Sequence, residues 1–277
     1  MENLLSIDYK SNFKEKQHKE EVVQTFLDKF NFDPKKSLYV GIERESFTSR
    51  EGKIIPLVPE ILPLIKLTQP KFQDFGYELS ACQLEMRYGP YHISDVLNGF
   101  SLADRELKNL EEKFNFSCYF ADTAGQEISL DVYPDPTGRY AKMASSLDPK
   151  VLHAACYVAG THVHVGMPNA EDALRVYNKL SKHLQGLIEV GDNSQGERIS
   201  YYKLMSNKTN PQLHENIMAW VNHSLDEKYY EDPRKNWALI RISIHGTIEF
   251  RMFGSTPDTL KIYNWVNMCY DLCKMYL

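Results

Sequence analysis

Four short segments alternate apolar side chains with charged or polar ones, and this alternation constrains the fold more than any other feature of the sequence. They are LYVGIERESF at 38–47, CQLEMRYG at 82–89, GTHVHVG at 160–166 and GTIEFRMFG at 246–254. Successive side chains of a β-strand point to opposite faces of its sheet. Each segment therefore predicts a strand with one apolar face and one face that carries Glu, His, Arg or Gln.

The polar faces of these strands gather groups that bind metal ions and anions. They carry Glu43, Glu45, Gln83, Glu85, Arg87, His162, His164, Glu249 and Arg251. Two residues apart on a strand, the first two glutamates lie about 7 Å from each other. A face that only meets solvent is expected to carry Thr, Ser and Lys, whereas none of these positions is lysine. Crowded carboxylates repel unless cations neutralise them, and this donor set favours Mg²⁺ or Mn²⁺.

A single Glu-x-Glu or His-x-His pair is more often an exposed sheet edge than a site, so this prediction depends on the four strands sharing one sheet. Arg87, Arg241 and Arg251 would then bind phosphate or carboxylate oxygens through paired hydrogen bonds. The combination indicates phosphoryl-transfer chemistry. The sequence contains no P-loop, dinucleotide-binding turn, kinase catalytic loop or Gly-x-Ser-x-Gly elbow. A nucleotide would therefore have to bind on the sheet itself.

Apolar residues at helical spacing predict four helices packed on one side of a mixed sheet. The first runs to about Pro34, the second follows Ser94 as N-cap, the third runs from Asn169 to Leu187, and the fourth follows Asp258. In the fourth helix the residues expected to point inward are Leu260, Tyr263, Val266, Tyr270 and Cys273. The 277 residues contain no internal repeat or long linker, which favours one domain.

Composition argues against several classes of function. The net charge is −5, with 32 Lys and Arg against 37 Asp and Glu, so we expect no broad basic surface for nucleic acid or anionic lipid. We also expect neither a secretory signal nor a membrane span, because no run of about 18 apolar residues occurs. Five cysteines without a Cys-x-x-Cys pair favour a reducing compartment, which predicts a cytoplasmic protein.

Five segments carry a resemblance to a known family. They are GIERE at 41–45, ELSACQLEMRYGP at 78–90, RYAKM at 139–143, GTHVHVG at 160–166 and DPRKNWALIRISIHGTIEFR at 232–251. In this order they resemble the glutamate–cysteine ligase type 2 family, carboxylate–amine ligases related in fold to glutamine synthetase, over about residues 38–265. The resemblance implies an α+β fold like the glutamine synthetase catalytic domain, with a curved, mainly antiparallel sheet forming a half-open barrel and helices on its outer face. One catalytic domain would span 1–277, with a helical segment at 1–36 and a ligase core at 38–277.

The resemblance also implies roles for individual residues. Glu43, His162 and Glu249 look like ligands of a metal ion that bridges the phosphates of ATP, and Glu45, Glu78 and Glu85 like ligands of an ion beside the substrate. Arg251 resembles the arginine that holds the transferred phosphoryl group, with Arg241 and His164 near the phosphates. Catalysis would depend on Arg251, Glu249 and Glu43. The residues on the substrate side would be Arg87, Arg139, Arg198, Tyr201 and Lys203.

The activity implied is that of an ATP- and Mg²⁺- or Mn²⁺-dependent carbon–nitrogen ligase. A glutamate-like acid would be activated as an acyl phosphate and joined to an amine or amino acid, most simply as a γ-glutamyl amide. Two alternatives stay open, a phosphotransferase of the same fold and a non-catalytic homologue that binds a nucleotide or metabolite. The segment between Gly166 and Asp232 is compact for the family, so the amine is left open, as is a homo-oligomeric state.

Overall fold

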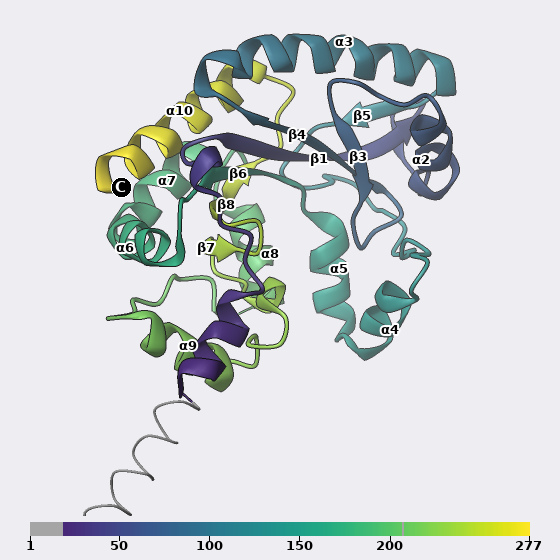
Figure 1. Cartoon of the computed structure of the whole chain (residues 1–277). Coiled ribbons are helices and arrows are strands. Elements are labelled where there is room, and N and C mark those ends of the chain that lie inside the picture. Colours follow the sequence, from purple (N-terminus) through teal and green to yellow (C-terminus); the bar gives the residue numbers. More distant parts are fainter. Residues whose placement is uncertain (1–18, 207) are drawn as a thin grey trace, which may run out of the picture.

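An antiparallel sheet forms the centre of the protein, whose computed structural model describes residues 19–206 and 208–277 (Figure 1). The strands follow the order β3–β4–β1–β6–β8–β7, and β2 and β5 also pair with β1. Every pairing among the described strands is antiparallel. The strands are β1 (Val40–Arg50), β2 (Lys53–Ile54), β3 (Asp74–Tyr77), β4 (Gln83–Tyr91), β5 (Ser117–Tyr119), β6 (Gly160–Gly166), β7 (Ile240–Ser243) and β8 (Thr247–Gly254).

The four predicted strands are confirmed as β4, β1, β6 and β8, which are consecutive in the sheet. The mixed sheet expected from the pattern is wrong, because the pairings are antiparallel, as the resemblance implied. Within the described chain the edge strands β3 and β7 do not pair with each other, so the sheet is open and does not close into a barrel.

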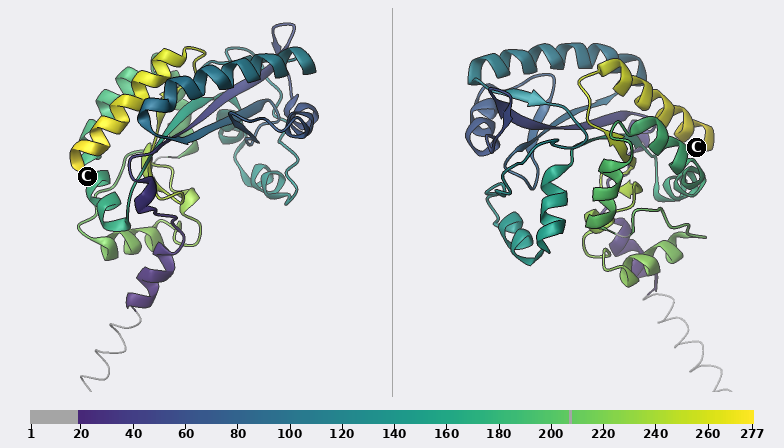
Figure 2. Two further views of the ribbon diagram at one scale, coloured as in Figure 1. Left: turned by 45° about the horizontal axis from the view of Figure 1, so that its top comes forward. Right: turned by 180° about the vertical axis from the view of Figure 1, so that it is seen from behind.

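Helices flank the sheet on both sides (Figures 1 and 2). They are α2 (Val58–Leu67), α3 (Val96–Phe114), α4 (Arg139–Ser146), α5 (Pro149–Tyr157), α6 (Ala170–Leu180), α7 (Leu184–Gly191), α8 (Glu197–Met205), α9 (Ile217–Asp226) and α10 (Thr259–Tyr276), with residues 19–27 also helical. Short 3₁₀ turns are η1 (Pro34–Lys36), η2 (Ile93–Asp95), η3 (Ser181–His183) and η4 (Pro233–Lys235). No helix in the described part of the chain is both long and apolar enough to cross a bilayer.

The core lies between the apolar face of the sheet and the layer of helices that contains α3, α6 and α10 (Figure 1). Ile42, Val163 and Phe250 on β1, β6 and β8 are fully or almost fully buried there. The apolar stripe of α3, from Val96 to Leu110, is buried against the same core. Removing this apolar surface from water is the main force that holds the sheet to the helices.

A charged side chain, Arg44, also lies on this apolar face. Its Nη1 is 3.0 Å from Asp104 Oδ1 on α3, and its Nε donates to the backbone oxygen of Thr256. The guanidinium stacks on the ring of Phe120, 3.8 Å from its centroid. Because a buried charge is costly without partners, these contacts make Arg44 a fixed link between β1 and the helical layer.

The predicted helix starts are confirmed at α6 and α10, where Asn169 and Asp258 accept hydrogen bonds from backbone N–H groups of the first turn. Four details differ. The first helix ends at residue 27, Asp95 rather than Ser94 precedes α3, and the helix expected to reach Leu187 breaks at η3 into α6 and α7. Leu260 is 62% exposed, because the buried stripe of α10 begins at Ile262. Residues 1–18 of the expected N-terminal helical segment lie outside the described residues.

The other face of the sheet is not left open to solvent. In Figures 1 and 2, α4 and α5 lie beyond this face on one side, and α8 and α9 lie on the other. Helices were expected on one side of the sheet, and further helices lie on the other side as well. Side chains from α4, α5 and α8 instead form walls above the polar face of the strands, which creates the cavities described next.

Candidate active site

Strand register brings the polar side chains of five strands into one continuous band. Glu43 of β1 is opposite Arg87 of β4 and His162 of β6. His164 of β6 is opposite Glu249 of β8. Since directly opposed residues of adjacent strands point to the same face, the predicted convergence of these side chains is what the fold produces.

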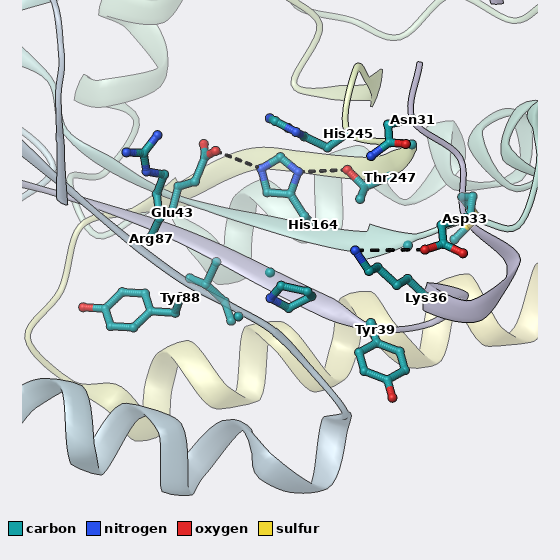
Figure 3. A pocket seen from close by; sticks show the side chains of 17 residues that line it. Asn31, Asp33, Lys36, Tyr39, Glu43, Arg87, Tyr88, His164, His245 and Thr247 are labelled. Carbon is teal, nitrogen blue, oxygen red and sulfur yellow. Dashed lines mark hydrogen bonds and ion pairs between the residues drawn. The ribbon is translucent and has the colours of Figure 1, made fainter. Parts of the chain in front are cut away.

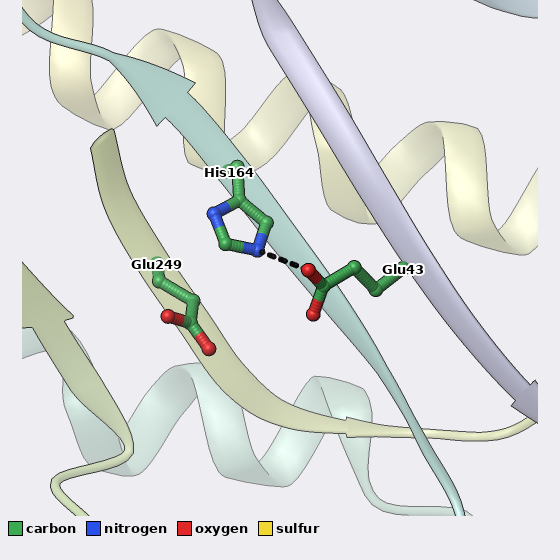
Figure 4. A group of neighbouring side chains, drawn as sticks. All are labelled: Glu43, His164 and Glu249. Atoms are coloured by element: carbon green, nitrogen blue, oxygen red, sulfur yellow. Dashed lines mark ion pairs between the residues drawn. The ribbon is translucent and has the colours of Figure 1, made fainter. Parts of the chain in front are cut away.

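Three of these residues could hold a metal ion. One donor atom from each of Glu43, His164 and Glu249 lies within 4.8 Å of the other two (Figure 4). His164 Nδ1 is 2.9 Å from Thr247 Oγ1, while Nε2 faces Glu43 Oε1 at 3.5 Å and is buried without a hydrogen-bond partner. Burial opposes ionisation of Glu43, but His164 and His162 hold its pKa well below the ordinary value. Ionised oxygens and an unpartnered imidazole nitrogen form a donor set that suits a divalent cation.

His162 lies beside this three-residue cluster, against Glu43 and Glu45. Its Nδ1 is 3.1 Å from Glu43 Oε2, and its Nε2 is 3.7 Å from Glu45 Oε1. Glu45 also accepts a hydrogen bond from the backbone N–H of Gly160 at 2.7 Å. In this structure His162 therefore bridges two carboxylates, whereas His164 belongs to the three-residue cluster.

Two arginines neutralise Glu249, which is 1% exposed. Arg241 makes two hydrogen bonds to its carboxylate at 2.7 and 3.0 Å, and Arg251 Nη1 is 2.5 Å from Oε1. Burial alone would raise the pKa of Glu249, but these guanidinium groups lower it far below the ordinary value. Arg251 Nε donates to the hydroxyl of Tyr202 at 2.6 Å. The arrangement fixes two positive groups at the floor of the band.

A second carboxylate pair lies toward the other edge of the sheet. Glu78 follows β3, and Glu85 lies on β4. Burial and the charge of Glu45 raise the pKa of Glu78 to about 7, and burial and Glu78 raise that of Glu85 well above its usual range. Arg87 compensates only in part, because its Nε is 3.2 Å from Glu85 while its Nη2 is 2.6 Å from Asp74. Without a cation, this pair holds a proton near neutral pH.

A cavity of about 260 Å³ covers this band. Its lining includes the carboxylates of Glu43, Glu45 and Glu78 and five arginines, besides apolar and aromatic side chains. The arginines are Arg139, Arg198, Arg234, Arg241 and Arg251. Arg198 is 1% exposed and donates to the backbone oxygens of Ala159 and Arg251, yet its Nη1 has no hydrogen-bond partner. The cavity, called here the arginine cavity, is suited to an anion with several oxygens.

Only some of the residues expected on the substrate side line the arginine cavity. Arg139 and Arg198 line the arginine cavity. Tyr201 instead packs against Tyr157 of α5, and Lys203 is exposed on α8 outside the lining. The sequence reasoning missed Tyr202, although it lies four residues after Arg198 and so on the same face of a helix.

A second cavity, of about 280 Å³, adjoins the cluster of Glu43, His164 and Glu249 at the other end of the band (Figure 3). Figure 3 shows Glu43 and His164 at one end, with Asp33, Lys36 and Tyr39 from the segment before β1 at the other. Arg87 lies here rather than in the arginine cavity. The N-terminal segment is held close, because Asn31 N–H donates to Ile244 O at 2.8 Å. The lining is largely apolar and is suited to a flat organic group.

Two curated proteins of Rhodococcus jostii (strain RHA1) are similar to this chain. One, provisionally named glutamate–cysteine ligase 2-3, is 26% identical over 165 residues, covering 58% of this chain and 20% of the relative. The other, provisionally named glutamate–cysteine ligase 2-1, is 27% identical over 169 residues, covering 57% of this chain and 42% of the relative. The resemblance to carboxylate–amine ligases is confirmed. The chain spans less than half the length of either relative.

A solved structure shares the fold. The crystal structure of a bifunctional glutathione synthetase from Pasteurella multocida matches with a TM-score of 0.54 and 12% identity, covering 87% of this chain and 38% of that chain. No protein-family profile matches the sequence. The α+β architecture with an open antiparallel sheet is thus shared with a ligase, whereas the residue roles rest on the geometry described above.

Proposed function

We propose that this protein is an ATP-dependent carboxylate–amine ligase of the glutamate–cysteine ligase type, with the glutamine synthetase-like arrangement of its sheet. The observation that carries the proposal is the continuous band on the sheet, which holds metal-binding carboxylates between two cavities. The nucleotide would bind in the largely apolar cavity beside Lys36 and Tyr39, and the acid in the arginine cavity. The names of the two curated relatives support the same class of reaction.

Two groups of residues would hold Mg²⁺ or Mn²⁺. The first is Glu43, His164 and Glu249, where the unpartnered Nε2 of His164 fits a metal ligand. The second is Glu45, Glu78 and Glu85. The raised pKa values of Glu78 and Glu85 indicate that negative charge at these two carboxyl groups lacks compensation. A bound divalent ion would neutralise phosphate and carboxylate oxygens as charge develops on them.

In the proposed reaction, a carboxylate oxygen of the acid bonds to the γ-phosphorus of ATP as the bond to the bridging oxygen breaks, releasing ADP. The amine nitrogen then bonds to the acyl carbon, the carbon–oxygen bond to phosphate breaks, and the nitrogen loses a proton to solvent. Arg251 and Arg241 stabilise the transferring phosphoryl group, and Tyr202 orients Arg251. Arg198 Nη1 is available to bind a carboxylate of the acid. Such pre-positioned charges are the main source of catalysis in phosphoryl transfer.

The test is incubation of the protein with ATP, Mg²⁺ or Mn²⁺ and glutamate, with and without a pool of amino acids and amines, while ADP and product mass are followed together. The expected result is ADP formation that needs both acid and amine, and a product mass equal to their sum minus water. Glu249→Gln should abolish it. The matched control is Glu112→Gln, which changes an exposed glutamate of α3 on the far side of the sheet.

Other outcomes separate the alternatives. A stable phosphorylated acceptor without an amide would establish a phosphotransferase instead. Binding of ATP without turnover, in the presence of every acid tested, would refute the ligase and favour a nucleotide-binding homologue.

A further inference from the structure

A third cavity lies outside the proposed active site, between α6, α9, the segment after α8 and the turn before β7. Its volume is about 490 Å³. Its walls include Tyr177 of α6, His214 of the segment after α8, and His223 of α9, together with Glu227 and Tyr229 just beyond that helix. None of these residues belongs to the band on the sheet. The proposed ligase reaction therefore leaves this cavity, called here the histidine cavity, without a function.

Two imidazole rings lie next to each other in the wall of this cavity. The ring centroids of His214 and His223 are 5.0 Å apart, and His214 stacks on Tyr177 with an interplanar angle of 6°. None of the described residues hydrogen-bonds to either ring. Burial, and then the charge of His223, lowers the pKa of His214 to about 4, and burial also lowers that of His223. Both rings are therefore neutral at physiological pH, and each offers one donor and one acceptor.

A buried hydroxyl in the same wall also lacks a partner. Tyr229 is 4% exposed, and its Oη has no hydrogen-bond partner. The nearby Trp220 indole can only donate, so it cannot accept the hydroxyl proton. Buried hydroxyl groups nearly always find a partner, and an orphan beside a polar cavity points to a bound molecule.

Charges of both signs line the cavity. Glu227 contributes a carboxylate, which is paired with Lys208, and Lys235 contributes a second ammonium group that has no carboxylate within ion-pair distance among the described residues. A simple anion would face Glu227, and a simple cation would face the two lysines. A small molecule that carries both an ammonium and a carboxylate group satisfies both signs of charge.

We propose that the histidine cavity binds a free amino acid as its zwitterion. Glu227 receives the ammonium group, Lys235 and the hydroxyl of Tyr229 bind the carboxylate, and the histidine and tyrosine rings contact the side chain. The site shares none of the proposed metal-binding or phosphoryl-binding residues, so amino-acid binding there can be measured without the ligase reaction.

Its position nevertheless links it to the active site. Trp237 lines both the histidine cavity and the arginine cavity, and its ring lies 6.0 Å from that of Tyr202. Asn236 lines the histidine cavity, and its backbone oxygen accepts a hydrogen bond from Arg241 at 2.8 Å. A ligand that fixes the turn before β7 would therefore also fix Arg241. The bound amino acid is either the amine substrate awaiting transfer or an effector, and both have the same chemistry.

The test is calorimetric titration of the full chain, without ATP, with each of the twenty common L-amino acids. We expect at least one to bind. The N-acetylated and carboxamide forms of that amino acid each lack one charge and should bind about tenfold more weakly or worse. The unmodified amino acid should bind the Tyr229→Phe and Glu227→Gln variants more weakly by a similar factor. Circular dichroism and thermal unfolding would show that both variants are folded. Glu112→Gln, on α3 at the far side of the sheet, is the control and should bind like the wild type. Glu78→Gln tests whether the amino acid binds in the arginine cavity instead.

The proposal is overturned if no amino acid binds, or if binding is weakened by Glu78→Gln and not by Tyr229→Phe. If an amino acid does bind, the product mass shows whether it is a substrate or an effector. An amino acid that appears in the amide is the substrate, and one that changes kcat or KM without being consumed is an effector. If an amino acid binds in the histidine cavity but no amide forms, the proposed ligase activity is refuted and the amino-acid site is supported.

Discussion

Replacing Glu78 tests whether the carboxylate pair in the active site is under electrostatic strain. Burial and neighbouring carboxylates raise its pKa from 4.5 to about 7, so folding takes up a proton between these values. A raised folded-state pKa contributes stability that is complete below pH 4.5 and is lost as the pH rises through 7. At 1.36 kcal/mol per pKa unit, a shift from 4.5 to about 7 destabilises the folded protein by about 3 kcal/mol at pH 8.5. Glu78→Gln removes the titrating group but keeps a donor for Glu85.

The assay is urea unfolding of wild type and Glu78→Gln at pH 4.5 and pH 8.5, followed by tryptophan fluorescence in buffer containing EDTA. We expect the free energy of unfolding of the variant, relative to that of the wild type, to be about 3 kcal/mol higher at pH 8.5 than at pH 4.5. Adding Mg²⁺ at pH 8.5 should stabilise the wild type more than the variant, because the cation replaces the proton. If the free-energy difference between the two proteins is the same at both pH values, the assignment of repulsion to this pair is refuted.

Three further changes probe the rest of the band. Glu249→Ala should lower the free energy of unfolding by about 3–5 kcal/mol, because it leaves Arg241 and Arg251 buried without their counter-charge; urea unfolding measures this. Thr247→Val removes the partner of His164 Nδ1 and should weaken Mn²⁺ binding about tenfold, as measured by electron paramagnetic resonance. Tyr202→Phe releases Arg251 Nε and should lower kcat of the proposed ligase about tenfold with KM for ATP unchanged; an unaltered kcat would remove Tyr202 from the mechanism.

The polar band could be predicted from sequence because it depends on local geometry. A period of two places Glu43 and Glu45 on one face whatever the strand pairs with, and the apolar residues between them fix which face meets the core. The order of strands was not needed, since any antiparallel arrangement that buries the apolar face also aligns the polar ones. This is why His162, His164 and Glu249 could be expected on one face of the sheet. The register that places His164, rather than His162, opposite Glu249 needed the structure.

Features that depend on long-range contacts were not predictable in the same way. Arg44 occupies a position that the alternation assigns to the core, and only Asp104 on a distant helix explains how its charge is accommodated. The edge strand β3 has four residues, too few to show a period. On α8 the prediction chose Tyr201 over Tyr202, because the face of a helix that meets a cavity depends on where the helix is packed.

The band contains two pairs of carboxyl groups, and the negative charge of each pair is compensated in a different way. Glu249 is neutralised by two arginines and Glu43 is held ionised by two histidines, so a cation joining them meets carboxylates that are already deprotonated. Glu78 and Glu85 carry a proton near neutral pH, so a cation that binds there must displace it. Cation affinity at the second group must therefore rise with pH through about 7. At the first group the carboxylates are ionised, but against the effect of burial Glu43 raises the pKa of His164, so a cation that binds its Nε2 must displace a proton from the imidazole ring. Cation binding on this sheet face is thus coupled to proton release at both groups, from a histidine at the first and from a carboxyl group at the second.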